Sequence, residues 1–506
     1  MKRIRILATS DVHGNILPLN YADNKYRSRG FAKIKTAIDC LKDDNTIVLD
    51  NGDVLEGTAL AFYHYDRHPD ELSPFTKAMN AIEYDYVNVG NHDFDHGEEA
   101  LMMHLQNLKA PCITSNWIYH GKPFGPTYVI REIAGKKIAL FALTTAFTND
   151  SQKKSNVRHS KFQDAVETAK RTVNTIRRLE RPDYVVCLYH GGFERDVNTG
   201  IAENKITNEN QAYRLCREIS GIDVLIAGHT HHSMSGRLFN TTYIETGAHG
   251  TEVACIDILP DTGRIETHIL KCDMDADAGI IQSIANEEEE CQAWLDKPLG
   301  TAKIDLSISD DIKDRVHKPQ LITFMNKAAM DYTRADLSAS SFYLHTKGLP
   351  HEITMRDLVS SYVYPNTLVV KQISGKTLRE YLEKCASYFA LQIDGTIDID
   401  ATYVVPSPIY YNYDMVDGVD YTINVSNPVG SRITELKRNG EDVTDDMMFT
   451  IAINNYRAIG GGDYMMLKDL PTVREYTMSI VDMLANYIRD AQVIDFEPVN
   501  NITVTK

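Results

Sequence analysis

Five short apolar runs in the first half of the chain are each followed within a few residues by an aspartate, asparagine or histidine. These runs span residues 4–8, 47–49, 86–89, 185–188 and 224–227. Continuous apolar runs of this length predict buried parallel strands, because such strands are covered on both faces. Ligands of α/β sheets bind at the carboxyl ends of the strands. The pattern therefore predicts that five loops, far apart in sequence, meet at one edge.

Strand and helix patterns alternate over residues 1–272, which indicates a layered α/β domain. Helices are expected at 98–108 and 162–179, a hairpin at 128–143, and three successive strands within 243–272. This part of the chain is predicted to be the first domain.

The composition changes after residue 272, where an acidic stretch begins. Residues 273–318 are interpreted as a helical linker, and residues 319–506 as a smaller, mixed α+β domain that binds the substrate. Within this second domain, helices are predicted at 320–332 and 376–386 and strands at 359–373, 420–425 and 449–453.

Charge and composition narrow the class of protein. The 506 residues carry a formal net charge of −17, which argues against binding to a nucleic acid polymer. No stretch is long and apolar enough to predict a membrane span. The eight cysteines form no CxxC pair and are expected to be buried free thiols. As written, the N-terminus has no signal peptide, so a cytoplasmic location is expected, or an exported one if a signal was trimmed.

Each predicted loop carries side chains that suit a divalent metal ion. They are Asp11, His13, Asp53, Asn91, His190, His229 and His231. Carboxylates and imidazoles are ligands of divalent transition metals, and the two oxygens of Asp53 can bridge two ions. Any one of these motifs is also an ordinary turn. Five of them in one α/β domain favour a site.

His92 and Asp95 are three residues apart in Asn91-His92-Asp93-Phe94-Asp95. At this spacing a carboxylate can hold an imidazole in one tautomer and raise its basicity. We interpret His92 as a contact to the phosphoryl oxygen or the leaving group rather than as a metal ligand. Asp93 is interpreted as a solvated or capping residue.

The order Asp-x-His, Gly-Asp, Gly-Asn-His-Asp, His and Gly-His-x-His resembles the calcineurin-like metallophosphoesterases. The resemblance implies a four-layer αββα domain with two divalent ions, which could be manganese, zinc, iron, cobalt or magnesium. It places Asp11, His13, Asp53 and His231 on the first ion, and Asp53, Asn91, His190 and His229 on the second. It also makes His92 and Asp95 the catalytic dyad.

The second domain contains the segment Asn454-Asn455-Tyr456-Arg457-Ala458-Ile459-Gly460-Gly461-Gly462-Asp463. Tyr456 offers a flat face for a nucleobase, the glycines allow backbone to approach a ligand, and Asp463 can accept hydrogen bonds. A glycine-rich surface turn is the alternative interpretation. Tyr411 and Tyr413 point the same way if their segment is extended, although a half-buried aromatic strand would give the same pattern.

This domain resembles the C-terminal domain of the 5'-nucleotidase family, and within it the 2',3'-cyclic-nucleotide 2'-phosphodiesterase/3'-nucleotidases. Segments 364–368, 388–390 and 454–458 carry the finer match. The resemblance implies that Tyr456 and either Tyr413 or Tyr411 stack on the base, with Asp463 and Asn454 near the nucleoside. Residues 338–343 contain no arginine where ordinary 5'-nucleotidases carry one, which favours the cyclic-nucleotide branch.

Two alternatives stay open at this point. One is a 5'-nucleotidase or another nucleotide or nucleotide-sugar phosphohydrolase, which would use the same metals and dyad. The other is a nucleotide-binding protein with little turnover, which the intact dyad disfavours. In either case the expected partner is a small nucleotide, with no nucleic acid polymer, membrane or obligate protein partner.

Overall fold

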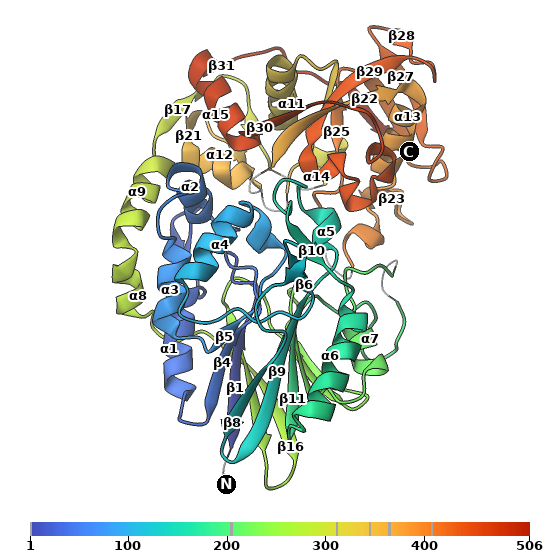
Figure 1. Ribbon diagram of the computed structural model, residues 1–506. Coiled ribbons are helices and arrows are strands. Elements are labelled where there is room, and N and C mark those ends of the chain that lie inside the picture. Colours follow the sequence, from blue (N-terminus) through green and yellow to red (C-terminus); the bar gives the residue numbers. More distant parts are fainter. Residues whose placement is uncertain (1–2, 203–205, 310–311, 344–345, 363–365, 406–407) are drawn as a thin grey trace. The chain divides into compact units, whose positions relative to one another are not determined.

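The computed structural model describes residues 3–202, 206–309, 312–343, 346–362, 366–405 and 408–506 (Figure 1). These residues form two compact units, Met1–Cys291 and Gln292–Lys506. The boundary falls inside helix α9 (Ala285–Leu295), which follows α8 (Ala278–Ser283). The predicted helical linker therefore begins with two successive helices.

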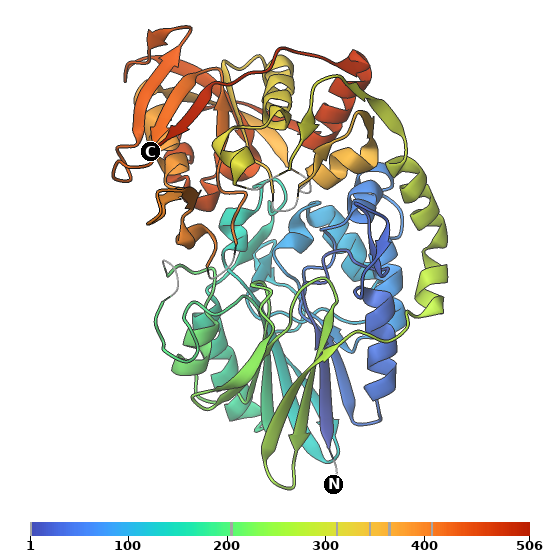
Figure 2. The ribbon, with the colours of Figure 1, turned by 180° about the vertical axis from the view of Figure 1, so that it is seen from behind.

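Two sheets form the centre of the first unit. The first has the strand order β16-β15-β1-β4-β5, with β1, β4 and β5 parallel and β15 and β16 antiparallel. Its strands are β1 (Ile4–Thr9), β4 (Thr46–Asp50), β5 (Tyr86–Val87), β15 (Glu252–Leu259) and β16 (Arg264–Lys271). The β15–β16 pair is seen from behind in Figure 2, in yellow-green near the N-terminus.

The second sheet has the order β13-β14-β12-β11-β9-β8. Its central strands are parallel, and β8 and β13 are antiparallel edge strands. The strands are β8 (Val129–Ile133), β9 (Lys136–Thr144), β11 (Tyr184–His190), β12 (Val224–Ala227), β13 (Met234–Leu238) and β14 (Thr241–Glu245). The hairpin predicted at 128–143 is the β8–β9 pair, which turns at Ala134 and Gly135.

The two sheets pack face to face around a shared core. Alternate residues of β11 show the division: Val186 and Leu188 join the core with the first sheet, whereas Val185 and Cys187 face the helix side. This alternation is the two-residue period of a strand that is buried on both faces. The outer core of the second sheet includes Ala169 of α6 and Leu215 of α7.

Helices cover the outer faces of the sheets (Figure 1). They are α1 (Phe31–Leu41), α2 (Ala59–Arg67), α3 (Pro74–Ile82), α4 (Glu98–Asn107), α5 (Thr148–Ser151), α6 (Ala165–Leu179) and α7 (Ala212–Glu218). Short pairs at the periphery are β2 (Leu19–Asn20) with β3 (Lys25–Tyr26), and β6 (Trp117–Tyr119) with β7 (Lys122–Pro123) and β10 (Ser160–Phe162). The predicted four-layer αββα architecture is confirmed.

The second unit is smaller and mixed. Its main sheet has the order β25-β19-β29-β22-β30, and a second sheet has the order β28-β27-β26-β32. Their strands are β19 (Leu337–Ser340), β22 (Thr367–Ser374), β25 (Met415–Asp417), β26 (Asp420–Asn424), β27 (Ile433–Arg438), β28 (Glu441–Asp442), β29 (Met448–Asn454), β30 (Thr472–Ser479) and β32 (Ile502–Thr505).

The remaining elements of the described part of this unit are short strands and helices. The strands are β17 (Pro298–Ala302), β18 (Leu306–Ser307), β20 (Gly348–Leu349), β21 (Glu352–Thr354), β23 (Phe389–Leu391), β24 (Ile397–Ile399) and β31 (Val493–Ile494). The helices are α10 (Lys313–Val316), α11 (Gln320–Thr333), α12 (Met355–Ser361), α13 (Gly375–Ala386) and α15 (Ile480–Ala491), to which the short α14 (Asn455–Ala458) is added at the end of β29.

One secondary-structure prediction in this unit is wrong. Residues 359–361 were expected to open a strand, but they end helix α12. A capping box, in which the side chains of Thr354 and Asp357 bond each other's backbone N–H groups, starts this helix. Tyr364 and Pro365, which fall within the strand predicted over 359–373, lie outside the described residues.

The cysteines are all free, and six of the eight are buried, whereas Cys40 is exposed and Cys112 is partly exposed.

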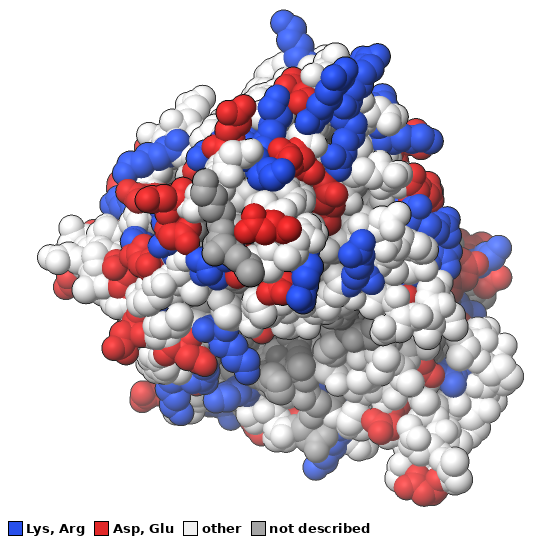
Figure 3. All heavy atoms as spheres, turned by 90° about the horizontal axis from the view of Figure 1, so that it is seen from below, with Lys and Arg blue, Asp and Glu red and all other residues white. Residues whose placement is uncertain are grey.

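No helix in the described ranges combines the length and apolar character that a membrane crossing requires. Acidic and basic side chains are interspersed on the face seen from below in Figure 3.

Candidate metal centre

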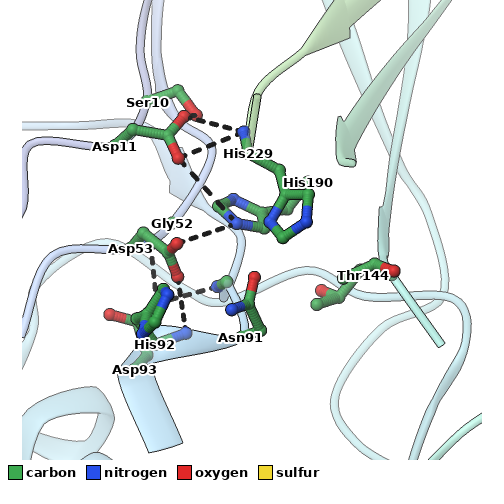
Figure 4. Close-up of polar contacts among 12 residues, drawn as sticks. Ser10, Asp11, Gly52, Asp53, Asn91, His92, Asp93, Thr144, His190 and His229 are labelled. Atoms are coloured by element: carbon green, nitrogen blue, oxygen red, sulfur yellow. Dashed lines mark hydrogen bonds and ion pairs between the residues drawn. The ribbon is translucent and has the colours of Figure 1, made fainter. Parts of the chain in front are cut away.

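The predicted ligands lie at the carboxyl ends of strands from both sheets (Figure 4). Asp11 and His13 follow β1, Asp53 follows β4, and Asn91 follows β5 in the first sheet. His190 ends β11, and His229 and His231 follow β12 in the second sheet. The site is thus formed at the joint edge of two stacked sheets rather than at the edge of one.

Six of the predicted ligands fall into two groups, and within each group the potential ligand atoms lie within 4.8 Å of one another. Asp11, His13 and His231 form one group, and Asp53, His190 and His229 form the other. Asp53 stands between them, since its Oδ2 lies 3.1 Å from His190 Nε2 and 3.9 Å from His13 Nε2. The structure therefore brings these predicted ligands together, with one carboxylate facing both groups.

Several of these polar atoms have no hydrogen-bond partner although they are buried. Asp53 Oδ2, Asn91 Oδ1 and His190 Nε2 are all of this kind. In addition, His13 Nε2 and His231 Nε2 lie only 3.1 Å apart. Buried polar groups are normally satisfied, so lone-pair atoms that converge in this way fit divalent cations. The residues present fit the metal that the fold implies.

The backbone at the ligands is in an unusual conformation. Asp11, His13, Asp53, His229 and His231 all have positive φ, between 47° and 74°. This left-handed region disfavours most residues with a side chain, although aspartate and histidine tolerate it better than most. Positive φ also occurs in ordinary turns, but five such residues in one cluster are typical of a functional site, where the surrounding structure holds the backbone in place.

Glycines allow two of the loops to touch. Gly52 has φ 91°, and a Cβ there would lie 2.2 Å from the backbone nitrogen of Gly90. A Cβ on Gly90 would lie 2.1 Å from Asp53 Oδ1. Neither position can carry a larger residue without moving the other loop, so the Gly-Asp and Gly-Asn motifs pack as one unit.

The electrostatics of the cluster keep its carboxylates ionised. Burial alone would raise the pKa of Asp53, but His190 and His92 lower it well below its usual range. The pKa of Asp11 is also lowered, because His190 and His231 outweigh the effect of burial, which would raise it. Burial lowers the pKa of His13 to about 3, which leaves a neutral imidazole with a lone pair for a cation.

The predicted dyad is assembled. His92 Nδ1 lies 2.8 Å from Asp95 Oδ2, and the His92 backbone N–H donates to Asp53 Oδ1 at 2.7 Å. Burial lowers the pKa of His92, but Asp95 and Asp53 outweigh it and raise that pKa well above its usual value. His92 is therefore placed to carry a proton beside the ligand cluster.

Asp93 is a buried capping residue, and the solvated interpretation is wrong. Its carboxylate accepts backbone N–H groups from Asp53, Val54, Leu55 and Gly90, at 2.7–3.1 Å. These donors come from the two loops that follow β4 and β5. Asp93 therefore ties the Asp53 loop to the Asn91 loop.

Three polar residues near the centre are absent from the sequence prediction. Glu56 is buried, with an oxygen within 4.8 Å of the ligand atoms of His92 and Asp95. Gln152 Nε2 donates to Asp95 Oδ1 and to the Asn91 carbonyl. Glu209 Oε1 lies 3.2 Å from His229 Nε2. Gln152 and Glu209 come from loops without a periodic pattern, whereas Glu56 stands only three residues after Asp53.

In the second unit, the tyrosines predicted to contact the base lie in two different places. The rings of Tyr411 and Tyr456 have centroids 6.3 Å apart and planes at 68°, an edge-to-face pair. Tyr413 is instead buried, with 1% exposure, and stacks on Tyr388 at 5.1 Å. The segment is a turn at Tyr411 rather than an extended strand, so Tyr411 and Tyr413 do not face the same side.

The glycine-rich segment packs against the chain's own side chains. A Cβ on Gly461 would lie 2.6 Å from the Tyr456 ring, and one on Gly462 would lie 2.0 Å from Asn412 Oδ1. Asn454 Oδ1 accepts the Arg457 N–H at 2.8 Å and caps α14. Asp463 is exposed at the end of the segment, with φ 65°.

Residues 338–343, the segment that contains no arginine, lie near Tyr411 and Asn454 in the second unit. Ser340 at the end of β19, with Ser341 and Tyr343, lines a small cavity that also includes Asn454 and Tyr362. The Tyr343 ring lies 6.2 Å from that of Tyr411. Serine hydroxyls and tyrosines therefore stand beside the Tyr411–Tyr456 pair.

Comparison with known proteins settles the family. The sequence model described as calcineurin-like phosphoesterase matches residues 4–233, and the model described as 5'-nucleotidase, C-terminal domain, matches residues 298–469. The chain belongs to the calcineurin-like phosphoesterases that carry a 5'-nucleotidase C-terminal domain. It is a metal-dependent phosphoester hydrolase.

Individual relatives are similar over most of this phosphoesterase. A 2',3'-cyclic-nucleotide 2'-phosphodiesterase/3'-nucleotidase from Yersinia enterocolitica is 25% identical over 90% of the chain and 81% of the relative. The trifunctional nucleotide phosphoesterase protein YfkN of Bacillus subtilis is 24% identical over 99% of the chain, which spans only 39% of that relative.

A solved structure extends the likeness to the whole fold. A presumed 5'-nucleotidase from Staphylococcus aureus, crystallised in complex with alpha-ketoglutarate, has a TM-score of 0.94 and 28% identity to the phosphoesterase. The match covers 100% of both chains. The α/β fold with two domains is thus shared with a nucleotidase-like protein.

Proposed function

We propose that this phosphoesterase holds two divalent ions, opens 2',3'-cyclic nucleotides to 3'-nucleotides and then removes the 3'-phosphate. The observation that carries the proposal is the position of Asp53, whose Oδ2 faces both His13 and His190. A carboxylate shared by two ligand groups suits a pair of closely spaced ions.

In this proposal the ligand sets are those expected from the sequence. One ion is held by Asp11, His13, Asp53 and His231, and the other by Asp53, Asn91, His190 and His229. When bound, two such ions supply an activated water and neutralise charge on the phosphoryl oxygens. Manganese, zinc, iron, cobalt and magnesium all suit this mixture of nitrogen and oxygen ligands.

The protein's own residues supply the proton transfer. The hydrogen bond from His92 Nδ1 to Asp95 fixes the imidazole and leaves Nε2 for the substrate. The protonated ring stabilises charge on the phosphoryl group and protonates the departing sugar oxygen. Gln152, which donates to Asp95, keeps that carboxylate turned toward His92.

The nucleoside part of the substrate is assigned to the second unit. We place the base against Tyr456 with Tyr411 beside it, because Tyr413 is buried against Tyr388. Asp463 and Asn454 are proposed to contact the nucleoside. Stacking on an aromatic ring accepts any base, so this assignment predicts a broad base preference.

The choice of branch is supported by two observations. The Yersinia enterocolitica relative is named for the cyclic-nucleotide activity, and residues 338–343 contain no arginine. A 5'-nucleotidase is the second candidate, because the Staphylococcus aureus structure is described as one. Both candidates use the same metal centre and dyad.

One experiment separates the candidates. Phosphate release and product identity are measured from 2',3'-cyclic AMP, 3'-AMP and 5'-AMP in parallel, with manganese added and metal content determined. We expect the first two substrates to be preferred. Preference for 5'-AMP would replace the proposal with a 5'-nucleotidase, and a content of one ion per chain would reject the two-ion centre.

A further inference from the structure

Glu209 lies directly against one of the proposed metal ligands. Its Oε1 is 3.2 Å from Nε2 of His229. The ligand atom of His229 is in turn within 4.8 Å of those of Asp53 and His190. Glu209 belongs to none of the five loop motifs of the metal centre.

The backbone of Glu209 is fixed to the second sheet. Its carbonyl accepts the hydroxyl of Thr145 at 2.6 Å and that of Tyr189 at 3.1 Å. The next residue, Asn210, accepts the Gly192 N–H at 2.8 Å. Thr145 follows β9 and Tyr189 lies within β11, so the same strand that carries His190 also anchors Glu209.

His190 shows what such a contact does. Its Nδ1 lies 2.8 Å from the Asn51 carbonyl, and that oxygen can only accept, so Nδ1 carries the hydrogen. In the neutral ring that a metal ligand requires, Nε2 is then the nitrogen without a hydrogen, and it lies 3.1 Å from Asp53 Oδ2. The outer hydrogen bond thus selects the tautomer whose lone pair faces the cluster.

We propose that Glu209 performs the corresponding task for His229. The carboxylate accepts the Nε2 hydrogen, which leaves the Nδ1 lone pair for a divalent cation, and its negative charge makes the imidazole a stronger donor. Glu209 is then a positioning residue that acts through His229. The inference rests on the proposed assignment of His229 as a ligand of the second ion.

The test is manganese binding by the full chain after removal of bound metal with a chelator. Isothermal titration gives the number of ions and the affinity of each for wild type, Glu209→Gln and Glu209→Ala. We expect two ions in every variant, with one site weakened about 10- to 100-fold in Glu209→Ala. Glu209→Gln, which keeps an acceptor oxygen without the charge, should lie between Glu209→Ala and wild type.

Glu218→Gln is the matched control, because that carboxylate pairs with Arg214 on α7 and touches none of the proposed ligands. Thermal unfolding establishes that every variant is folded. Equal affinities in wild type and Glu209→Ala would overturn the inference, and so would loss of one whole ion equivalent, since Glu209 would then be a ligand itself. A wild-type protein that binds a single ion would instead reject the two-ion proposal.

Discussion

Arg457 and Asp414 form a buried ion pair in which Nε lies 2.7 Å from Oδ2 and Nη2 lies 3.1 Å from Oδ1. Both side chains are only 2% exposed. The same guanidinium donates to the carbonyls of Gly461 and Tyr411. The ion pair therefore joins the glycine-rich segment to the turn that carries Tyr411.

Removing one partner of this pair should destabilise the protein strongly. Arg457→Met leaves the Asp414 carboxylate buried without its counterion, a change that costs about 3–5 kcal/mol in comparable proteins. The measurement is the free energy of unfolding in urea. Lys437→Met is the control, because solvent and salt screen the exposed Lys437–Glu435 pair, which should contribute little to stability. Equal losses in the two variants would contradict a structural role for the buried pair.

His92→Asn should reduce turnover while the metal content stays the same. The imidazole is not among the proposed ligands, and general acid catalysis commonly contributes a factor of about 10²–10⁴ in rate. Turnover and metal content are measured on the same preparation, with Asp95→Asn as the companion variant. Unchanged turnover in His92→Asn would remove this residue from the mechanism.

Tyr456→Ala should weaken nucleotide substrates and leave a simple aryl phosphate unaffected. Loss of one stacked base costs about 1–3 kcal/mol, which is roughly 5- to 150-fold in kcat/KM. Tyr413→Ala is an informative comparison. Removal of that buried ring should lower the stability of the protein and leave the preference for nucleotides over the aryl phosphate unchanged. If Tyr456→Ala impairs both substrates equally, the stacking role is incorrect.

The first unit should lose stability as the pH falls below about 6.5, the usual pKa of histidine. Burial lowers the pKa of His104 to about 3 and those of His64 and His96 to about 4. Between these values and 6.5 the unfolded chain binds the extra protons, so acid favours unfolding. Above about 6.5 both states are neutral and the full stability is present.

For each of these histidines, the free energy of unfolding can fall by at most about 1.4 kcal/mol per pH unit. His104 is the residue to replace, because its Nδ1 contacts Thr76 and no proposed ligand. Urea unfolding at pH 7.5 and pH 5 is compared for wild type and His104→Gln. An identical pH dependence in the two proteins would rule out the buried histidine as a source of acid sensitivity.

The convergence of the proposed ligands was predictable because they stand at the ends of apolar strands. Asp11, Asp53 and His190 each follow a continuous buried run, and the carboxyl ends of these strands meet at the joint edge of the two sheets. The position of Tyr413 was not predictable, since the two-residue period applies only to extended backbone, and the chain turns at Tyr411. Glu209 could not be found either, because it is held by hydroxyl contacts to its carbonyl that leave no periodic pattern.

The positive φ angles at Asp11, His13, Asp53, His229 and His231 link the choice of metal ligand to the choice of backbone. A substitution at these positions must suit both the cation and the left-handed conformation. Asparagine and glycine meet the second demand, whereas valine and isoleucine meet neither. The paths by which this centre can change its metal preference through mutation are therefore few, and they run through residues with short polar side chains.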